Sequence, residues 1–336
     1  MCGAVAAAPK PKQAETESGK MSMQREMEQV LCQVEKVISG KREVILKILA
    51  VLLADGHVLL DDVPGVGKTT LALALSRALG LQFCRVQFTP DVLPSDLTGF
   101  SMYDRESGRF VYHPGMLQNA QLLLGDEINR TSSKTQSALL EAMEERQVSV
   151  DGITHALQRP FMVIATQNNV GMLGTQRLPY AQMDRFMAAL SMGYPDYEAQ
   201  MEMLKNRQAQ NPMDSVETVM DAAELLALQK AAQAISARDT VLDYMTRLTM
   251  ASRNCGDLEV AISPRGTLHL CRMAKAWAFL QGRDYVTAGD VQDVFADTCR
   301  HRLVLSRSAR AKGLEAERVL LQLLEETPNP DRGAAW

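Results

Sequence analysis

The sequence predicts an α/β fold in which a domain built on a central parallel sheet is followed by a small all-α domain. The first observation is the stretch 57–79, where an apolar run, a glycine-containing loop and a helix-forming segment follow one another. The second is a series of further apolar runs that end in polar residues and alternate with helical segments. The third is a change after Gly193, because almost everything beyond it has helical periodicity.

Length and composition favour a globular protein of a reducing, cytoplasmic setting. The 336 residues are 46% hydrophobic and 23% charged, which is ordinary for such proteins. Thirty-six basic against forty acidic residues give a net charge of −4, which disfavours general affinity for nucleic acid or for an anionic membrane. The six cysteines form no C-x-x-C pair, so neither a zinc site nor a disulfide framework is indicated. No apolar run reaches the roughly 18 residues of a membrane span.

The loop that follows the first strand resembles a phosphate-binding P-loop. The general pattern GxxxxGK[ST] has glycine where this chain has Asp62, so the match is GKT plus Gly65, and the Asp62 carboxylate must point away from bound phosphate. Lys68 is predicted to meet the β- and γ-phosphates, and Thr69 to place its hydroxyl on Mg²⁺. The whole predicted nucleotide cradle comprises Pro64, Gly65, Val66, Gly67, Lys68, Thr69 and Thr70. The alternative, a strand-to-helix turn that binds nothing, is disfavoured by the flanking strand and helix.

A second apolar strand, 120–125, ends in Asp126 and Glu127. This is the Walker B arrangement, in which Asp126 would hold Mg²⁺ through water and Glu127 would orient and deprotonate the attacking water. The alternative is an acidic strand end that faces solvent. A P-loop about sixty residues upstream favours the first interpretation. A third apolar strand, 161–166, leads to Asn168, whose amide would lie near the γ-phosphate or would simply cap a loop.

The remaining segments complete a two-domain plan. Residues 1–22 are rich in Ala, Pro, Lys and Glu and are expected to be a disordered tail. Residues 23–194 form the α/β domain, which begins with two helices within 24–54 and carries two β-hairpins, at about 99–114 and 147–159, the second with an Asp-Gly turn. Residues 195–326 form the helical domain, and 327–336 a frayed tail. Helix N-caps are predicted at Ser263 and at Thr287 with Asp290.

Several ordered motifs resemble the MoxR family of AAA+ ATPases, over nearly everything from Gln24 to Leu305. Two loops depart from that pattern, at Asn169, where proline often follows the asparagine, and at Gly115–Gln118. The stretches that carry the resemblance are Arg85–Asp91, Pro94–Gly99, Gly125–Arg130, Lys134–Glu145, Ala165–Asn168, Asp184–Phe186, Ser263–Arg265 and Gly282–Thr287.

The resemblance implies further roles. Asn168 is similar to sensor 1, Arg185 to an arginine finger that reaches the neighbouring subunit's γ-phosphate, and Arg265 to sensor 2, which also contacts the nucleotide from the helical lid. The hairpins resemble the helix-2 insert and the pre-sensor-1 insert. An arginine supplied by a neighbour couples assembly to hydrolysis, so a ring, expected to be a hexamer, is implied. From sequence alone, a surface salt bridge of Arg185 at a helix end is a plausible alternative, and the family position favours the finger.

Three functions are compatible with these features. The first is an ATP hydrolase, with ATP and Mg²⁺, that remodels a client protein or inserts a metal or cofactor into it; the resemblance suggests a client with a von Willebrand A-type domain. The second is a scaffold that switches on ATP with little turnover, which intact Glu127, Asn168 and Arg185 disfavour. The third is a nucleic-acid motor, because the hairpin inserts resemble those of a clade that also includes helicases; the acidic charge balance disfavours it.

Overall fold

The computed structural model describes residues 12–167, 178–209 and 211–331, with side chains from Gln24 on apart from 207–209. The N-terminus differs from the prediction, because helix α1 (Lys12–Glu35) already begins within the segment expected to be disordered. The reason is that no proline follows Pro11 in this segment, while Ala, Glu, Lys, Met and Gln all favour helix. A low apolar content therefore did not prevent helix formation.

The central sheet is parallel throughout, and the predicted α/β class is confirmed. Its strands are β1 (Val58–Asp61), β2 (Phe83–Gln87), β5 (Leu122–Asp126), β8 (Met162–Gln167) and β9 (Ala188–Leu190), in the order β2-β5-β8-β1-β9. In the register of neighbouring strands Asp61 pairs with Gln167, and Gln87 with Asp126. The polar residues that end these strands therefore gather at one edge of the sheet.

Helices cover both faces of this sheet. Leu60 and Ile164 belong to a core shared with α1, α2 (Arg42–Leu53) and α3 (Lys68–Ala78). Leu59 and Val163 point the other way, into a second core with α4 (Pro94–Thr98) and α5 (Ser133–Glu145). This alternation is the two-residue side-chain period of strands that are buried on both faces.

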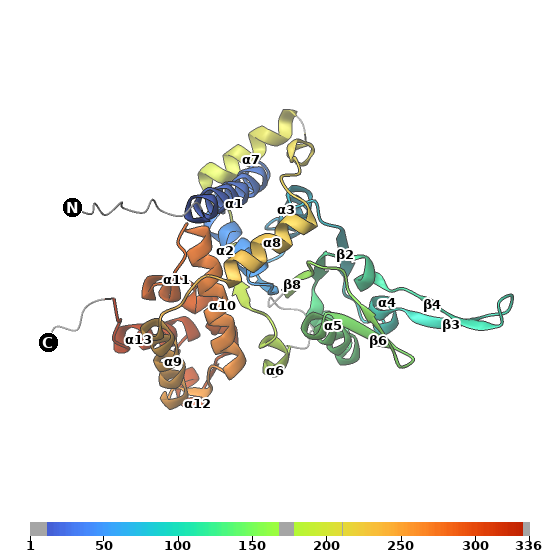
Figure 1. The fold of residues 1–336 in the computed structure, drawn as a ribbon. Helices are drawn as coiled ribbons and strands as arrows, with labels where there is room; N and C mark the ends of the chain where they lie inside the picture. Colours follow the sequence, from blue (N-terminus) through green and yellow to red (C-terminus); the bar gives the residue numbers. More distant parts are fainter. Residues whose placement is uncertain (1–11, 168–177, 210, 332–336) are drawn as a thin grey trace, which may run out of the picture.

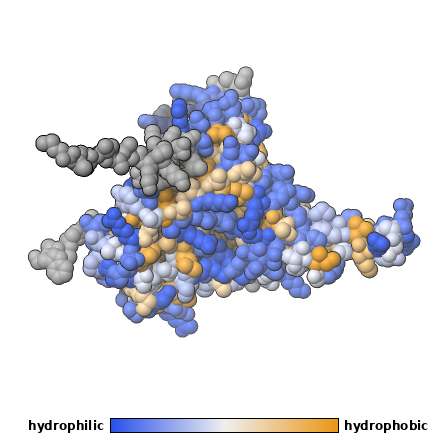
Figure 2. All heavy atoms as spheres, in the orientation of Figure 1, coloured by the Kyte–Doolittle hydropathy of each residue, from blue (hydrophilic) through white to orange (hydrophobic). Residues whose placement is uncertain are grey.

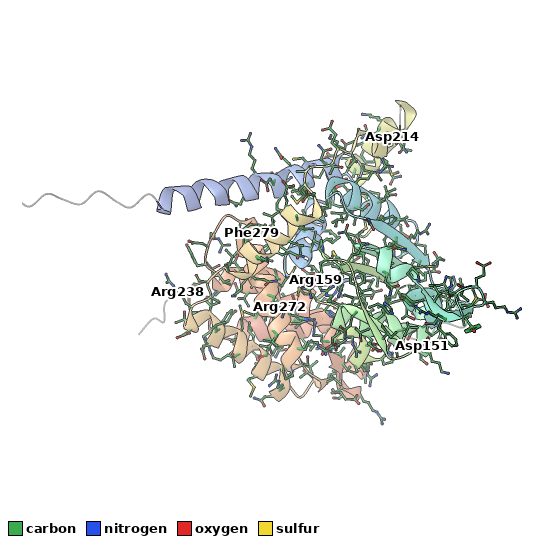
Figure 3. The ribbon with its side chains drawn as sticks, turned by 45° about the vertical axis from the view of Figure 1, so that its right-hand side comes forward. Asp151, Arg159, Asp214, Arg238, Arg272 and Phe279 are labelled. Carbon is green, nitrogen blue, oxygen red and sulfur yellow. The ribbon has the colours of Figure 1, made fainter. Side chains whose placement is uncertain are left out.

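Both predicted hairpins are present. The first pairs β3 (Phe100–Asp104) with β4 (Arg109–His113) and extends well beyond the body of the molecule (Figure 1). The second pairs β6 (Gln147–Val150) with β7 (Ile153–Ala156), and Asp151, which marks its tip in Figure 3, forms the predicted turn with Gly152. Stacking of the Tyr112 and His155 rings, 3.8 Å between centroids, joins the two hairpins.

Two neighbouring segments orient the first hairpin. At its base, a Cβ on Gly115 would lie 2.4 Å from the Gly99 backbone nitrogen, so only glycine allows this close approach. Beyond it, η1 (Met116–Asn119) is capped by Gln118, whose Oε1 accepts a hydrogen bond from the Gly115 amide (2.8 Å). The departure from the family pattern at Gln118 thus supplies a polar cap.

The chain after β9 is mainly helical, as predicted. Its elements are α7 (Tyr197–Ala209), η3 (Pro212–Ser215), α8 (Ala222–Gln233), α9 (Asp239–Asn254), α10 (Pro264–Leu280), α11 (Ala288–Cys299), η4 (Arg300–Arg302), α12 (Arg307–Ala311) and α13 (Ala316–Glu326). The predicted caps at Ser263 and Thr287 are confirmed, since their side chains accept hydrogen bonds from the Gly266 and Asp290 amides. A small antiparallel pair, β10 (Leu258–Val260) with β11 (Val304–Leu305), was not expected.

The helical domain packs firmly on the first domain. The core that contains α1 and α2 continues into α8, α10 and α11, and the buried Gln229 donates from Nε2 to the Leu52 carbonyl (2.7 Å). The expected frayed C-terminus is also partly packed, because Asp331 accepts a hydrogen bond from the Ala288 amide at the start of α11 (2.7 Å). Among the described residues, none of the helices combines the length and apolarity of a membrane span.

Candidate nucleotide site

A cleft of about 620 Å³ lies at the carboxyl edge of the sheet, where β1, β5 and β8 end. All seven residues of the predicted nucleotide cradle line it, from Pro64 to Thr70, and so do Asp126 and Glu127. Ligands of open parallel sheets bind at this edge. In Figure 3, Asp214 marks η3, whose first residue Pro212 also lines the cleft. The structure thus brings together two motifs that are sixty residues apart in sequence.

The loop has the backbone that phosphate binding needs. Gly65 and Gly67 have φ of 84° and 95°, in the left-handed region that favours glycine, and Gly67 is the N-cap of α3. The helix therefore starts at Lys68 with its amides and positive dipole end at the cleft. The Lys68 ammonium donates to the Asp62 carbonyl (2.9 Å). Partial burial lowers the pKa of Lys68, against the opposing effect of nearby carboxylates, Asp62 first among them.

Asp62 points away from the space where phosphate would lie. Its Oδ2 accepts hydrogen bonds from the backbone amides of Gly193 (2.9 Å) and Met192, just after β9. A carboxylate that accepts two backbone hydrogen bonds is satisfied without a cation. The residue that departs from the P-loop pattern therefore anchors the loop to the end of the neighbouring strand.

Asp126 is held in place at the end of β5. It is 8% exposed, its Oδ2 accepts from Arg85 Nε (2.8 Å), and the Thr166 hydroxyl lies 3.4 Å from its Oδ1. Oxygen ligands of this kind suit Mg²⁺, which takes one or two protein ligands and completes its shell with water and substrate phosphates. Thr69 in the same cleft adds a hydroxyl. The donor set of one carboxylate and one hydroxyl fits this ion. Within the described ranges there is no cluster of three or more His, Cys, Asp or Glu side chains that could hold a metal by itself.

Glu127 occupies a strained backbone position, with φ of 57°. Its amide donates to the Thr166 hydroxyl (2.9 Å), and its Oε2 accepts from Gln87 Nε2 (2.9 Å) and Arg130 Nη1 (2.7 Å). The carboxylate is thus fixed by residues of β2 and η2 (Ile128–Arg130), and the backbone of Glu127 by β8. The sequence motifs included Gln87 and Arg130, but nothing in the sequence alone showed that they hold Glu127.

Apolar side chains also line the cleft, among lysine and amide side chains. Val37 and Ile38 line it from the segment after α1, and Tyr194, Pro195 and Met203 line it from the start of the helical domain. Such a surface can accept a flat aromatic base. Sequence reasoning did not find it, because its two halves are more than 150 residues apart and hydrophobic side chains carry no motif.

Arg185 and Arg265 do not line the cleft. Instead, both bind Glu144 near the end of α5: Arg185 Nε lies 2.9 Å from Glu144 Oε2, and Arg265 Nη2 donates to Oε1. Within a single chain, Arg185 therefore makes the salt bridge that was the alternative interpretation of this residue. Arg265, expected to contact the nucleotide as sensor 2, lies beside Arg185, because the Ser263 cap at the start of α10 is bound to Asp184, the residue after α6 (Tyr180–Met183). Asn168 falls outside the described residues.

Comparisons with known proteins agree with this geometry. The model of the ATPase family associated with various cellular activities (AAA) matches residues 57–188, which span β1 to β9. The model of the AAA lid domain matches residues 250–323 of the helical domain.

Relatives match most of the chain. Chaperone MoxR1 of Mycobacterium tuberculosis is 36% identical, over 92% of this chain and 83% of its own. The uncharacterized protein YeaC of Bacillus subtilis is 42% identical, over 90% of this chain and 94% of its own. A crystal structure of a provisionally assigned ATPase from Cytophaga hutchinsonii superposes with a TM-score of 0.86 at 33% identity, over 95% of this chain and 98% of that one.

Proposed function

Since the chain belongs to the MoxR family of AAA+ ATPases, we propose that it hydrolyses Mg·ATP at the interfaces of a ring, expected to be a hexamer, and uses the energy to remodel a client protein. One observation carries this proposal. Lys68, Thr69, Asp126 and Glu127 share one cleft, whereas Arg185 and Arg265 lie together outside it. A single subunit therefore holds only part of the machinery that phosphoryl transfer requires.

Each residue of the cleft has a task that its surroundings permit. Lys68 and the amides at the start of α3 bind the phosphates, while Val37, Ile38 and Tyr194 accept the base. Thr69 and Asp126 hold Mg²⁺, which supplies positive charge to the phosphate oxygens when bound. Glu127 takes a proton from water as general base. The hydrogen bonds from Gln87 and Arg130 fix its Oε2, so we assign the proton transfer to Oε1.

Arg185 and Arg265 act on the nucleotide of the neighbouring subunit. Their side chains are about a third exposed, so a partner's phosphate can reach them. Positive charge placed where negative charge develops in the transition state lowers the barrier by several kcal/mol. The ring thus ties turnover to assembly.

The first hairpin is the surface that we assign to client contact. Phe110 is 75% and Met102 55% exposed on β3 and β4, and Figure 2 shows apolar residues along this protrusion. Exposed apolar groups on a protruding element mark interaction sites. A client with a von Willebrand A-type domain, into which a metal or cofactor would be inserted, is the finer proposal that the family suggests.

Steady-state ATPase measurements on the wild type and on Glu127→Gln test the proposal. We expect the substitution to abolish most turnover and leave ATP binding intact, because the amide cannot accept the proton but keeps the shape. Equal, negligible rates in both proteins would instead support the ATP-switched scaffold. Similarity to RuvB proteins, subunits of Holliday junction branch migration complexes, covers only 45% of this chain. Tight, ATP-linked and salt-dependent DNA binding would be needed to revive the nucleic-acid motor.

The arginine assignment has its own test. Arg185→Ala should lower turnover by about 10³-fold or more, the typical effect of removing an arginine finger, while ATP binding is unchanged. Normal hydrolysis by the purified variant would refute that role for Arg185.

A further inference from the structure

Glu144 binds two arginines that come from different parts of the chain. Its two carboxylate oxygens each accept from one of them, Oε2 from Arg185 Nε (2.9 Å) and Oε1 from Arg265 Nη2. Arg185 follows α6, and Arg265 lies in the first turn of α10. One carboxylate near the end of α5 therefore joins the first domain to the lid at the surface where both guanidinium groups lie.

The backbones that carry these arginines are fixed separately. Asp184, the residue before Arg185, accepts from the Ser263 hydroxyl (2.9 Å to each oxygen) and from Arg302 Nε (2.8 Å). Ser263 is the N-cap of α10, and the Arg302 side chain is 1% exposed. Asp184 thus positions both backbone segments, and its Oδ2 also lies 3.9 Å from Arg265 Nη1, a longer contact than the one that Glu144 makes with the same side chain.

Like charges repel, so two adjacent guanidinium groups need an anion between them to stay side by side. Glu144 supplies that anion, because its carboxylate accepts a hydrogen bond from each arginine. It engages Nε of Arg185 and one terminal nitrogen of Arg265, and within the described residues no hydrogen bond is made by Arg185 Nη2. Because the Arg185 side chain is 31% exposed, an external oxyanion can reach its outer edge.

We propose that Glu144 is a positioning residue that holds Arg185 and Arg265 as a preassembled pair for the nucleotide of the neighbouring subunit. The inference rests on the proposed function, in which these arginines act across the interface. Glu144 itself touches no nucleotide, and its effect on hydrolysis is transmitted by the arginines. Because its side chain is 36% exposed, its removal should cost the fold little, as is usual for surface ion pairs.

The test compares Glu144→Gln with Glu141→Gln, an exposed glutamate one turn earlier on α5. We expect Glu144→Gln to lower kcat roughly 10-fold to 100-fold, the range for a catalytic group displaced by about an ångström, while binding of a fluorescent ATP analogue is unchanged. Glu141→Gln should match the wild type in both measurements.

Two readouts separate positioning from a merely structural role. In the nucleotide-free protein, labelled with ¹⁵N-arginine and assigned with Arg185→Lys, the Arg185 Nε–H signal should shift in Glu144→Gln and not in Glu141→Gln. In addition, mixing Glu144→Gln with Glu127→Gln subunits should restore turnover above the sum of the two, because some interfaces pair an intact Glu127 with intact arginines.

The outcomes are distinct. A wild type without turnover would overturn the proposed function and this inference with it. Wild-type hydrolysis accompanied by equal kcat in Glu144→Gln, or by an unshifted Arg185 signal, would overturn the role of Glu144 alone. A mixture of Glu144→Gln and Glu127→Gln that regains no turnover would do the same only if a mixture of Glu127→Gln and Arg185→Ala does regain it; if both mixtures fail, the proposed action across the interface is overturned.

Discussion

A buried ion pair at the junction between the domains offers a quantitative test. Arg302 Nε lies 2.8 Å from Asp184 Oδ1, and the two side chains are 1% and 19% exposed. Burial lowers the pKa of Arg302, whereas Asp184 opposes this effect. Removing one partner of a buried pair typically costs about 3–5 kcal/mol. For Asp184→Asn we expect about 3 kcal/mol, the lower end, because the Phe186 and Met187 carbonyls still accept from the guanidinium.

A matched control exists in the same domain. Asp243 and Arg247 on α9 make an ion pair of similar length, 2.7 Å, but their side chains are 63% and 38% exposed. Asp243→Asn should therefore cost only about 0.3–0.5 kcal/mol, as for exposed pairs one helical turn apart.

Urea unfolding monitored by fluorescence of Trp277, which is 7% exposed on α10, measures both variants. A difference below about 1 kcal/mol between them would refute the reasoning that burial of the Arg302 pair holds the junction.

Two further predictions concern pH and the P-loop. Burial, the largest cause in each case, lowers the pKa of His269 to about 3 and those of His57 and His301 well below their usual value. Below about pH 6.5 the unfolded chain therefore binds more protons than the folded one, so the free energy of unfolding should decrease as the pH is lowered. The decrease should reach up to about 1.4 kcal/mol per histidine at pH 5.5. Urea midpoints that do not change between pH 7 and 5.5 would contradict this. Gly67→Ala should abolish binding of a fluorescent ATP analogue, whereas Gly152→Ala, with a similar φ of 78° at the hairpin tip, should cost comparable stability and spare binding. Equal binding by both variants would exclude a special role for the loop backbone.

The features predicted from sequence were local ones. A strand, a loop with glycines at positive φ and a helix start are encoded within about twenty residues, so the P-loop and the Asp126–Glu127 strand end were found in their correct contexts. The caps at Ser263 and Thr287 were equally local. Parallel strands then placed both motifs at one edge of the sheet.

Features that depend on distant partners could not be predicted. The direction of the Asp62 carboxylate is set by amides 130 residues away, and the placement of Arg265 beside Arg185 is set by how α10 packs on the first domain. The β10–β11 pair was missed because strands of two or three residues carry too little periodicity. The start of α1 was missed because composition was given more weight than helix propensity.

The central claim is that a complete site exists only between two subunits, and mixing two inactive variants tests it most directly. Glu127→Gln lacks the proposed base and Arg185→Ala lacks the proposed finger, so each alone should be nearly inactive. In rings formed from equal amounts of both, about one interface in four would pair an intact Glu127 with an intact Arg185, so we expect up to about a quarter of wild-type turnover. Turnover no higher than that of the separate variants would contradict the account.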